Sequence, residues 1–209
     1  MSIQSKALDK KFTEDFEKMI PDKGNRQIIM NAIDVFSRKG LAGTKIKDIA
    51  QKAGFSQGFV YNYFKSKDDI FTKIFDLALD GAGNSVKYAS ELKGTPYQKI
   101  YWLTEAYLSP EGISMHHWRL IMLQATTSEG IPEEAKRIAK EKVKRPFEYM
   151  LPILIQGQNM GEIVREDPLM LAITYFSFIQ GLGITRVQNG NNIPFPSIDM
   201  VLSFLKSKV

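Results

Sequence analysis

The chain has 209 residues, of which 44% are hydrophobic and 24% charged, and its formal net charge is +5. This composition is typical of a globular protein and excludes a disordered one. The chain contains no cysteine, which excludes disulfides and cysteine–zinc sites, so we expect a cytoplasmic protein. No apolar run approaches the roughly 20 residues that span a bilayer, so we expect no membrane partner.

Positive charge is concentrated near the N-terminus. Residues 1–70 contain 13 Lys and Arg against 9 Asp and Glu, whereas residues 71–209 contain 15 against 14. Between Arg38 and Lys67, seven basic residues accompany one acidic residue, Asp48. A basic patch at one end indicates a polyanionic partner, although a charge run alone is also typical of an ordinary solvated surface.

Helical periodicity runs through the chain, and sustained period-2 alternation is absent, so we predict an all-α fold. Residues 1–21 form an expected N-terminal arm with a short amphipathic helix that Pro21 stops. A helix over residues 25–39 follows, and Gly40 marks its end.

Two short helices come next, over residues 45–53 and 57–64. Thr44 and Ser56 are their predicted N-caps, and Gly54 supplies the turn between them. This arrangement indicates a helix-turn-helix, which presents one short helix to a DNA groove.

A fourth helix begins at residues 66–69, and Gly81 and Gly83 are expected to kink or end it. Residues 91–96 look like a boundary between two domains. Beyond it, four prolines mark predicted helix starts: Pro96, Pro110, Pro132 and Pro168. The helix after Pro132 is expected to break or bend near Pro146 and Pro152. A polar loop is expected over residues 188–192 and a last helix over residues 198–205.

The helix over 57–64 has two inward positions, Val60 and Phe64, and its other side chains suit a major groove. Gln57 and Asn62 have amide side chains that can pair with adenine, and the Phe59 ring can touch a thymine methyl. The hydroxyls of Tyr61 and Tyr63 can bind phosphate, and Lys45, Lys47 and Lys67 add positive charge. Gly58 allows close approach of the backbone to DNA.

Each assignment has a purely structural alternative. Tyr61 or Tyr63 can be half-buried packing residues, and Ser56 and Thr44 can be caps without a role in binding. Phe59 can simply stabilise the turn, and helix pairs joined by a tight turn also occur in proteins that do not bind DNA.

The residues of this segment resemble the N-terminal domain of the tetracycline-repressor (TetR) family over about 45 positions. The pattern consists of Arg26, Ile29, Ala32, Phe36, Gly40, Thr44, Ile49-Ala50, Ala53-Gly54, Ser56, Gly58, Tyr61, Tyr63-Phe64, Lys67 and Ile70. A weaker similarity at Ile155–Gly157, Gly161–Ile163 and Arg165–Asp167 resembles the end of the family's seventh helix and the start of its eighth.

The resemblance implies an all-helical homodimeric repressor on a palindromic double-stranded DNA operator. It places the DNA contacts at Thr44, Lys45, Lys47, Ser56, Gln57, Gly58, Phe59, Tyr61, Asn62, Tyr63 and Lys67. Two residues depart from the pattern: Lys45 replaces a small hydroxyl residue, and Phe59 is large at a variable base-facing position. The operator sequence therefore cannot be copied from a relative.

The resemblance also implies four regions and a ligand pocket. The regions are an arm (1–21), a helix-turn-helix DNA-binding domain (22–68), a connecting helix and linker (69–94), and an effector-binding and dimerisation domain (95–209). A lining of methionine and aromatic residues suits a small apolar effector, although such residues at helical spacing are usually core. The candidates are Trp102, Tyr107, Met115, His117, Trp118, Met122, Phe147, Met150, Tyr175 and Phe176.

Other classes of protein fit the sequence less well. His116 and His117 are adjacent on a helix and do not form the i, i+4 pair of a metal site, so we expect neither a metal nor another cofactor. No nucleophile–base pattern indicates an enzyme. The hypothesis is a sequence-specific DNA-binding transcriptional regulator, a repressor that a small apolar ligand releases; the alternative is a DNA-bound protein whose C-terminal domain docks a protein partner.

Overall fold

The structure, a computed structural model, describes residues 1–109, 130–189, 192 and 194–207. Within these ranges every regular element is an α-helix, and extended backbone pairs only in a single bridge between Ile163 and Lys206. The predicted all-α fold is therefore confirmed. The helices are α1 (Ile3–Met19), α2 (Lys23–Gly43), α3 (Ile46–Ala53), α4 (Gln57–Tyr61), α5 (Lys67–Glu91), α6 (Pro96–Leu108), α8 (Glu133–Lys142), α9 (Arg145–Asn159), α10 (Pro168–Asn189) and α11 (Ile198–Val201).

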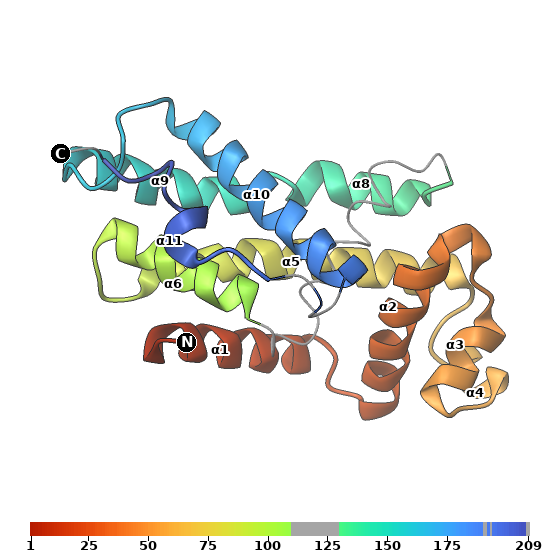
Figure 1. Ribbon diagram of the computed structural model, residues 1–209. Helices are drawn as coiled ribbons and strands as arrows, with labels where there is room; N and C mark the ends of the chain where they lie inside the picture. The colour runs from red at the N-terminus through yellow and green to blue at the C-terminus, as the bar shows by residue number, and fades with distance from the viewer. Residues whose placement is uncertain (110–129, 190–191, 193, 208–209) are drawn as a thin grey trace.

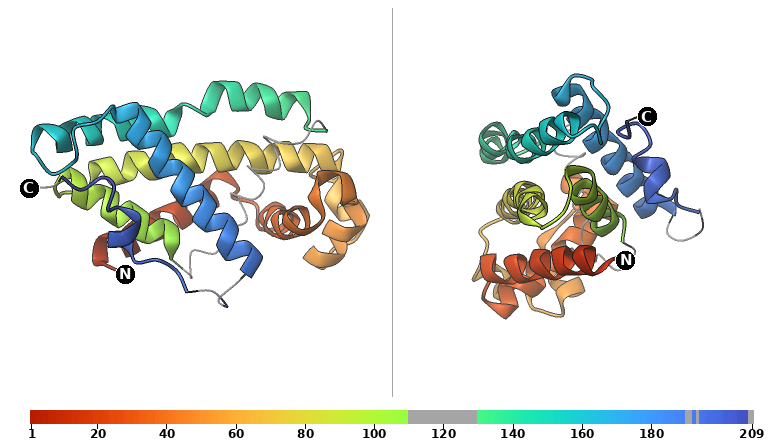
Figure 2. Two further views of the ribbon diagram at one scale, coloured as in Figure 1. Left: turned by 45° about the horizontal axis from the view of Figure 1, so that its top comes forward. Right: turned by 90° about the vertical axis from the view of Figure 1, so that its left-hand side faces the viewer.

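The long helix α5 is the axis of the molecule (Figure 1). A helix-turn-helix domain (α2–α4) packs at its N-terminal end, and a larger C-terminal domain (α6 and α8–α11) surrounds the rest. Figure 2 shows α8 and α9 along one side of α5, and α1 and α6 along another. The helix α10 runs diagonally and contacts α6 and α9.

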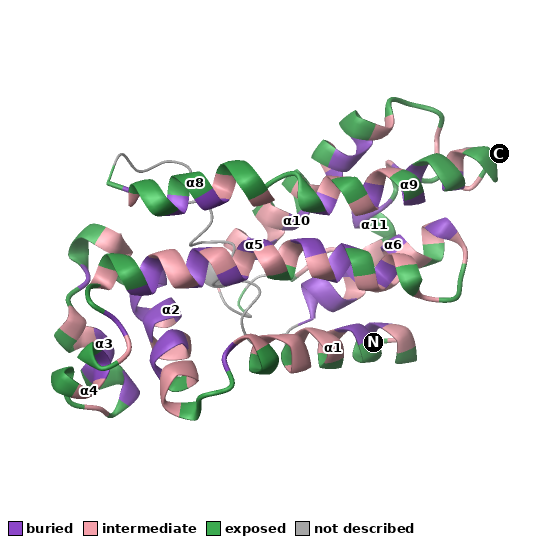
Figure 3. Cartoon of the chain, turned by 180° about the vertical axis from the view of Figure 1, so that it is seen from behind, coloured by how far each residue is buried: buried purple, intermediate pink, exposed green. Residues whose placement is uncertain are grey.

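Buried side chains form two clusters that divide α5 between them. The first cluster joins α2–α4 to α5 residues from Ile70 to Leu79, and it includes Ala135 and Ile138 of α8. The second joins the end of α5, at Val86 and Ala89, to α6, α9, α10 and α11. Figure 3 shows the buried positions following α5 along its length. Because each cluster excludes water from a different part of α5, this helix ties the two domains together.

The helix α1 is a packed element and not a loose arm. Leu8 is 2% exposed and belongs to the second cluster, whereas Phe16 and Met19 pack against the first. The Ser5 hydroxyl donates to a carboxylate oxygen of Glu105 at 2.6 Å. Burial disfavours the charged carboxylate, but this bond and those from Ser2 bring the pKa of Glu105 down to about 2. The helix therefore spans both clusters.

Several predicted boundaries need correction. Gly81 and Gly83 neither kink nor end α5, because helix packing on both sides outweighs the low helix propensity of glycine. By contrast, the end predicted at Gly40 is confirmed: its backbone is non-helical, at φ +68° and ψ 171°, and α2 consists of two helical pieces joined across this kink. The N-cap of α3 is Lys45 and not Thr44.

In the C-terminal domain, the break expected near Pro146 is found between α8 and α9, and this proline lies in the first turn of α9. Pro152 lies inside α9 without ending it. The last helix is shorter than predicted and ends at Val201. The start expected at Pro110 lies outside the described residues.

Leu8→Ala should lower the free energy of unfolding by about 2–5 kcal/mol, because the substitution leaves a cavity where α1 meets the second cluster. Urea unfolding followed by circular dichroism measures the change. Ile3 of the same helix is 84% exposed, and Ile3→Ala should change stability by no more than about 0.5 kcal/mol. Equal effects of the two substitutions would contradict the packing of α1.

Candidate nucleic-acid interface

The turn between α3 and α4 is built as the sequence predicts. Gly54 adopts the left-handed conformation at φ +72°, which a side chain would strain. The Phe55 amide then donates back to the Ala50 carbonyl at 2.9 Å. Ser56 is the N-cap of α4, and its hydroxyl accepts from the Phe59 amide at 3.1 Å, which confirms this predicted cap.

The inner face of α4 is anchored in the first cluster. Val60 is 0% exposed and Phe64 is 5% exposed, as the sequence predicts. From α2, the Gln27 side-chain amide donates to the Ala53 carbonyl at 2.7 Å and holds the end of α3. The orientation of α4 is therefore fixed by contacts with α2, α3 and α5.

The outer face of α4 is open to solvent. Gln57, Gly58, Tyr61 and Asn62 are exposed, and Tyr61 keeps 54% of its surface, which is unusual for a large aromatic residue. Ser56 is also exposed at the start of the helix. This face offers two amides, a phenol and a glycine to a groove-sized partner.

Phe59 differs from its predicted role. Its ring centroid lies 4.3 Å from that of Phe55 and 5.4 Å from that of Tyr63, so it is half-buried between two rings. A Cβ at Gly24 of α2 would lie 3.0 Å from the Phe59 ring and from the Tyr63 hydroxyl. This geometry favours the alternative role, in which Phe59 holds the turn and the start of α2 in contact.

Tyr63 is also half-buried and lies beside Asp22, the N-cap of α2. The Asn25 amide, at 2.7 Å, and then the Tyr63 hydroxyl lower the pKa of Asp22. The same hydrogen bond to Asp22 raises the pKa of the Tyr63 phenol. Tyr63 therefore joins the end of α4 to the start of α2 through its contact with Asp22.

Four of the seven basic residues between positions 38 and 67 are engaged within the domain. Arg38 and Lys52 both contact Asp34, at 2.9 and 3.1 Å, and Lys39 contacts Asp48 at 3.2 Å. Lys67 donates to the carbonyls of Leu41 and Ala42 at 2.8 and 3.2 Å. These four side chains support the fold, since their charges already have partners.

The other three cations face outward. Lys45, Lys47 and Lys65 are exposed and form no ion pair with any described residue within 4 Å. Two of them precede or begin α3, and Lys65 follows α4. The sequence assignment omitted Lys65, although its position directly after the exposed helix was a usable signal. These lysines form the unpaired part of the basic patch.

Thr44 is 1% exposed, and its hydroxyl donates to the Gly40 carbonyl at 2.7 Å. Its side chain therefore supports the end of α2 and has no free surface for a partner. With Lys67 and Phe59, it is one of three predicted contact residues that the structure directs toward the protein.

Four of the predicted effector residues, Met115, His117, Trp118 and Met122, lie outside the described residues. The other six lie in or against the second cluster on α6, α9 and α10: Trp102, Tyr107, Phe147, Met150, Tyr175 and Phe176. Trp102 also approaches Gly94 in the loop between α5 and α6.

The residues of α9 and α10 meet through their rings. The Phe147 centroid lies 5.1 Å from that of Phe176, which lies 5.2 Å from that of Tyr175. Buried hydroxyls accompany them: Thr104 and Tyr175 are 3.0 Å apart, and Ser85 bonds to Tyr107. The sequence analysis missed Ser85 and Thr104, because an isolated hydroxyl in an apolar helix gives no pattern.

One groove of about 350 Å³ lies on the surface between α10 and α11, and another of about 320 Å³ lies on α2. Neither includes a predicted effector residue. The first is lined by Ser177, Phe178, Gly181, Leu182, Pro196, Met200 and Val201, and the second by Lys23, Arg26, Gln27 and Met30.

The fold and this interface contain a helix-turn-helix, and comparison with known proteins shows what the chain is similar to. Residues 28–74 match the family described as bacterial regulatory proteins, tetR family. The uncharacterized HTH-type transcriptional regulator YfiR of Bacillus subtilis (strain 168) is 26% identical over 159 residues, which cover 74% of this chain and 75% of that protein. Over residues 28–74 the chain therefore resembles this family, and its relatives are described as HTH-type transcriptional regulators.

Two solved structures show the same fold. The TetR family transcriptional regulator PfmR from Thermus thermophilus superposes with a TM-score of 0.66 and 23% identity over 88% of this chain and 94% of that chain. FadR from Bacillus subtilis, in complex with stearoyl-CoA, gives a TM-score of 0.62 and 22% identity over 85% and 94%. At these identities the similarity establishes the fold alone.

Gly24→Ala should destabilise the protein by about 1–3 kcal/mol, because the added methyl overlaps the Phe59 ring and the Tyr63 hydroxyl. Gly81→Ala is the matched control. Gly81 is an exposed helical glycine whose Cβ would meet nothing within 4 Å, so alanine there should stabilise by about 0.5–1 kcal/mol. Thermal unfolding measures both changes, and stabilisation by Gly24→Ala would show that the two helices do not meet closely.

Proposed function

We propose that this chain is a sequence-specific repressor that acts as a homodimer in the cytoplasm and that a small apolar ligand releases from DNA. The observation that carries the proposal is the exposed outer face of α4, with Gln57, Tyr61 and Asn62, beside lysines without ion-pair partners among the described residues. Amide side chains read base edges, whereas the lysines add affinity with little sequence information.

The revised contact set follows from the geometry of the interface. Gln57 and Asn62 read bases, Tyr61 and the start of α4 at Ser56 and Gly58 contact the backbone, and Lys45, Lys47 and Lys65 contribute charge. Tyr63 contributes from its position beside Asp22, where it also supports α4. Thr44, Phe59 and Lys67 do not face the DNA and instead hold this surface in place through contacts within the protein.

The exposed side of α10 supports a homodimer. One side of this helix packs inward, where Ala172 and Tyr175 are at most 1% exposed. The outer side leaves large apolar residues at 42–52% exposure: Leu169, Met170, Ile173 and Phe178. By length and composition the stretch Pro168–Arg186 could cross a membrane, and 28% of it is buried within the subunit. We propose instead that a second copy covers its outer face. The groove beside α11 continues this apolar surface.

The second cluster supports an apolar effector. Aromatic and methionine side chains meet there with four buried hydroxyls, a combination that binds an apolar body and orients one polar group. A similar fold holds stearoyl-CoA in FadR from Bacillus subtilis. We propose Tyr107, Phe147, Met150, Tyr175 and Phe176 as lining residues, together with the four candidates outside the described residues and Trp102 at the margin.

The direct test is binding to the DNA upstream of the protein's own coding region. The purified chain should shift a labelled fragment of this DNA in preference to a scrambled fragment, and its affinity should fall steeply as salt rises. Failure to distinguish the two fragments at any salt concentration, after selection from a random DNA library has also yielded no preferred site, would contradict the proposal.

Gln57→Ala should reduce discrimination at one base pair by about 1–3 kcal/mol, while binding to other positions changes little. Selection from a random library, followed by competition binding, measures the preference. Gln51 is also an exposed glutamine but lies on α3, and Gln51→Ala should leave the preferred site unchanged. An unchanged preference in Gln57→Ala would remove this residue from the reading surface.

Phe178→Asp should dissociate the dimer, because it places a charge on an apolar face that a second copy would bury. Analytical ultracentrifugation of the folded variant should give a monomer, whereas Ile3→Asp on α1 should remain dimeric. A dimeric Phe178→Asp variant, or a monomeric parent protein, would exclude this face as the interface.

A further inference from the structure

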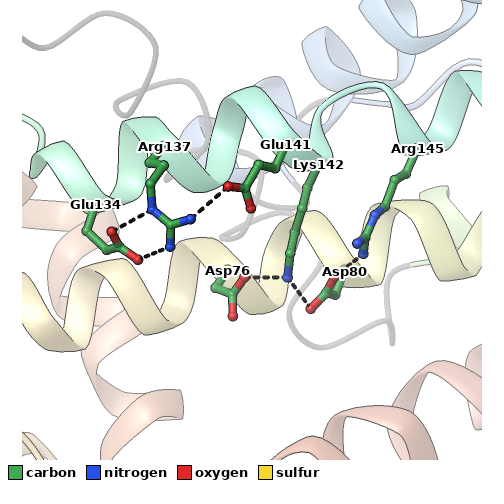
Figure 4. Close-up of polar contacts among 7 residues, drawn as sticks. All are labelled: Asp76, Asp80, Glu134, Arg137, Glu141, Lys142 and Arg145. Atoms are coloured by element: carbon green, nitrogen blue, oxygen red, sulfur yellow. Dashed lines mark hydrogen bonds and ion pairs between the residues drawn. The ribbon is translucent and has the colours of Figure 1, made fainter.

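Ion pairs link α5 to the junction of α8 and α9. Lys142, the last residue of α8, donates to Asp76 at 2.5 Å and to Asp80 at 2.7 Å. Arg145, the first residue of α9, donates to Asp80 at 2.7 Å. Figure 4 shows these four side chains between the two helices. We call Asp76, Asp80, Lys142 and Arg145 the interhelical ion-pair cluster.

The cluster differs from ordinary surface ion pairs. The Lys142 side chain is only 16% exposed, and the two carboxylates are 26% and 23% exposed. Asp76 and Asp80 are four residues apart on one helix face, where two like charges repel each other unless a cation lies between them. Partial burial strengthens both the attraction to Lys142 and the repulsion without it.

Close packing accompanies the charges. Gly83 lies on the same face of α5, seven residues after Asp76, and it is buried against Arg145. A Cβ at Gly83 would lie 3.1 Å from the Arg145 Cβ. The start of α9 therefore rests directly on the backbone of α5, and a shift of α9 must change the geometry of the ion pairs.

The position of the cluster gives it a consequence for the whole molecule. It lies where α5 passes from the first hydrophobic cluster, which ends at Leu79, to the second, which begins at Val86. On the other side, α8 belongs to the first cluster through Ala135 and Ile138, whereas α9 belongs to the second. The ion pairs therefore join the two cores at their boundary.

We propose that Lys142 is a positioning residue for DNA binding: through Asp76 and Asp80 it fixes the angle between α5, which carries the helix-turn-helix domain, and the junction of α8 and α9. The proposal rests on the proposed function only for its effect on DNA. Phe147, a proposed effector residue, lies two positions after Arg145, so displacement of α9 by a ligand would act on the same ion pairs. A ligand shifts such an equilibrium through its different affinity for the two arrangements.

The test measures the angle without DNA. The chain has no cysteine, so Gln51→Cys on α3 and Gln156→Cys on α9, both exposed positions, give two unique sites for spin labels. Labelled protein is diluted with an excess of unlabelled protein, so that a dimer contains one labelled subunit at most. Electron–electron resonance then gives the distance distribution between the two domains.

Lys142→Met should shift or broaden this distribution, and Lys142→Arg should restore the parent distribution. The matched control is Arg137→Met. Arg137 makes two ion pairs, at 2.6 and 2.7 Å to Glu134 and Glu141, but both lie within α8 (Figure 4). This control should leave the distribution unchanged. In binding assays, Lys142→Met should change affinity for the selected DNA site by roughly 2- to 30-fold.

An unchanged distribution in folded Lys142→Met overturns the proposal, and so does an equal change in Arg137→Met. If Lys142→Met does not fold, Asp80→Asn is the variant that tests the proposal, because it removes one carboxylate charge without changing the side-chain volume. An unchanged distance distribution in Asp80→Asn then overturns the proposal. If the parent protein binds no DNA site while the distance still responds to Lys142, the proposed function fails and the positioning role stands.

Discussion

The structure depends on the burial of α5 by two separate hydrophobic clusters. Ile70, Phe71 and Ile74 of this helix are fully buried against α2–α4, whereas Val86 and Ala89 are fully buried against the C-terminal domain. One continuous helix of 25 residues is therefore part of both cores. Because helices resist bending more than loops do, a change in how the C-terminal domain packs on α5 is carried to the other end as a rotation or translation.

The boundary between the two cores on α5 carries ion pairs, in contrast to the apolar cores themselves. Asp76 and Asp80 meet Lys142 and Arg145 there, between α5 and the junction of α8 and α9. Close-packed apolar interiors tolerate little displacement, whereas ion pairs can exchange partners over small movements. The boundary is thus the part of the molecule that can move at least cost, while each core keeps its own arrangement.

The sequence predicted the elements that local chemistry determines. The 3.6-residue period located the helices, and Gly54 with Ser56 located the turn, because a left-handed glycine and a hydroxyl cap act within a few residues. The sequence did not predict that Thr44 and Lys67 donate hydrogen bonds to backbone carbonyls of α2, since these contacts depend on tertiary structure. For the same reason the sequence predicts an arm where the structure has the packed helix α1, because the helical period shows an apolar face but not which helices cover it.

Tertiary contacts that the sequence does not predict also change the candidate DNA-binding site, and they reduce the number of side chains that can read bases. The family resemblance placed eleven residues at the DNA, but three of them are committed to packing or to backbone carbonyls, and Tyr63 shares its hydroxyl with Asp22. On α4 and its C-cap this leaves Gln57, Tyr61 and Asn62 as the large polar side chains that are exposed. Three side chains cannot distinguish every base pair of a half-site by direct contact. If the proposed contact set is right, recognition also uses the shape and deformability of the duplex, which the proposed backbone contacts of the lysines and of the start of α4 would sense.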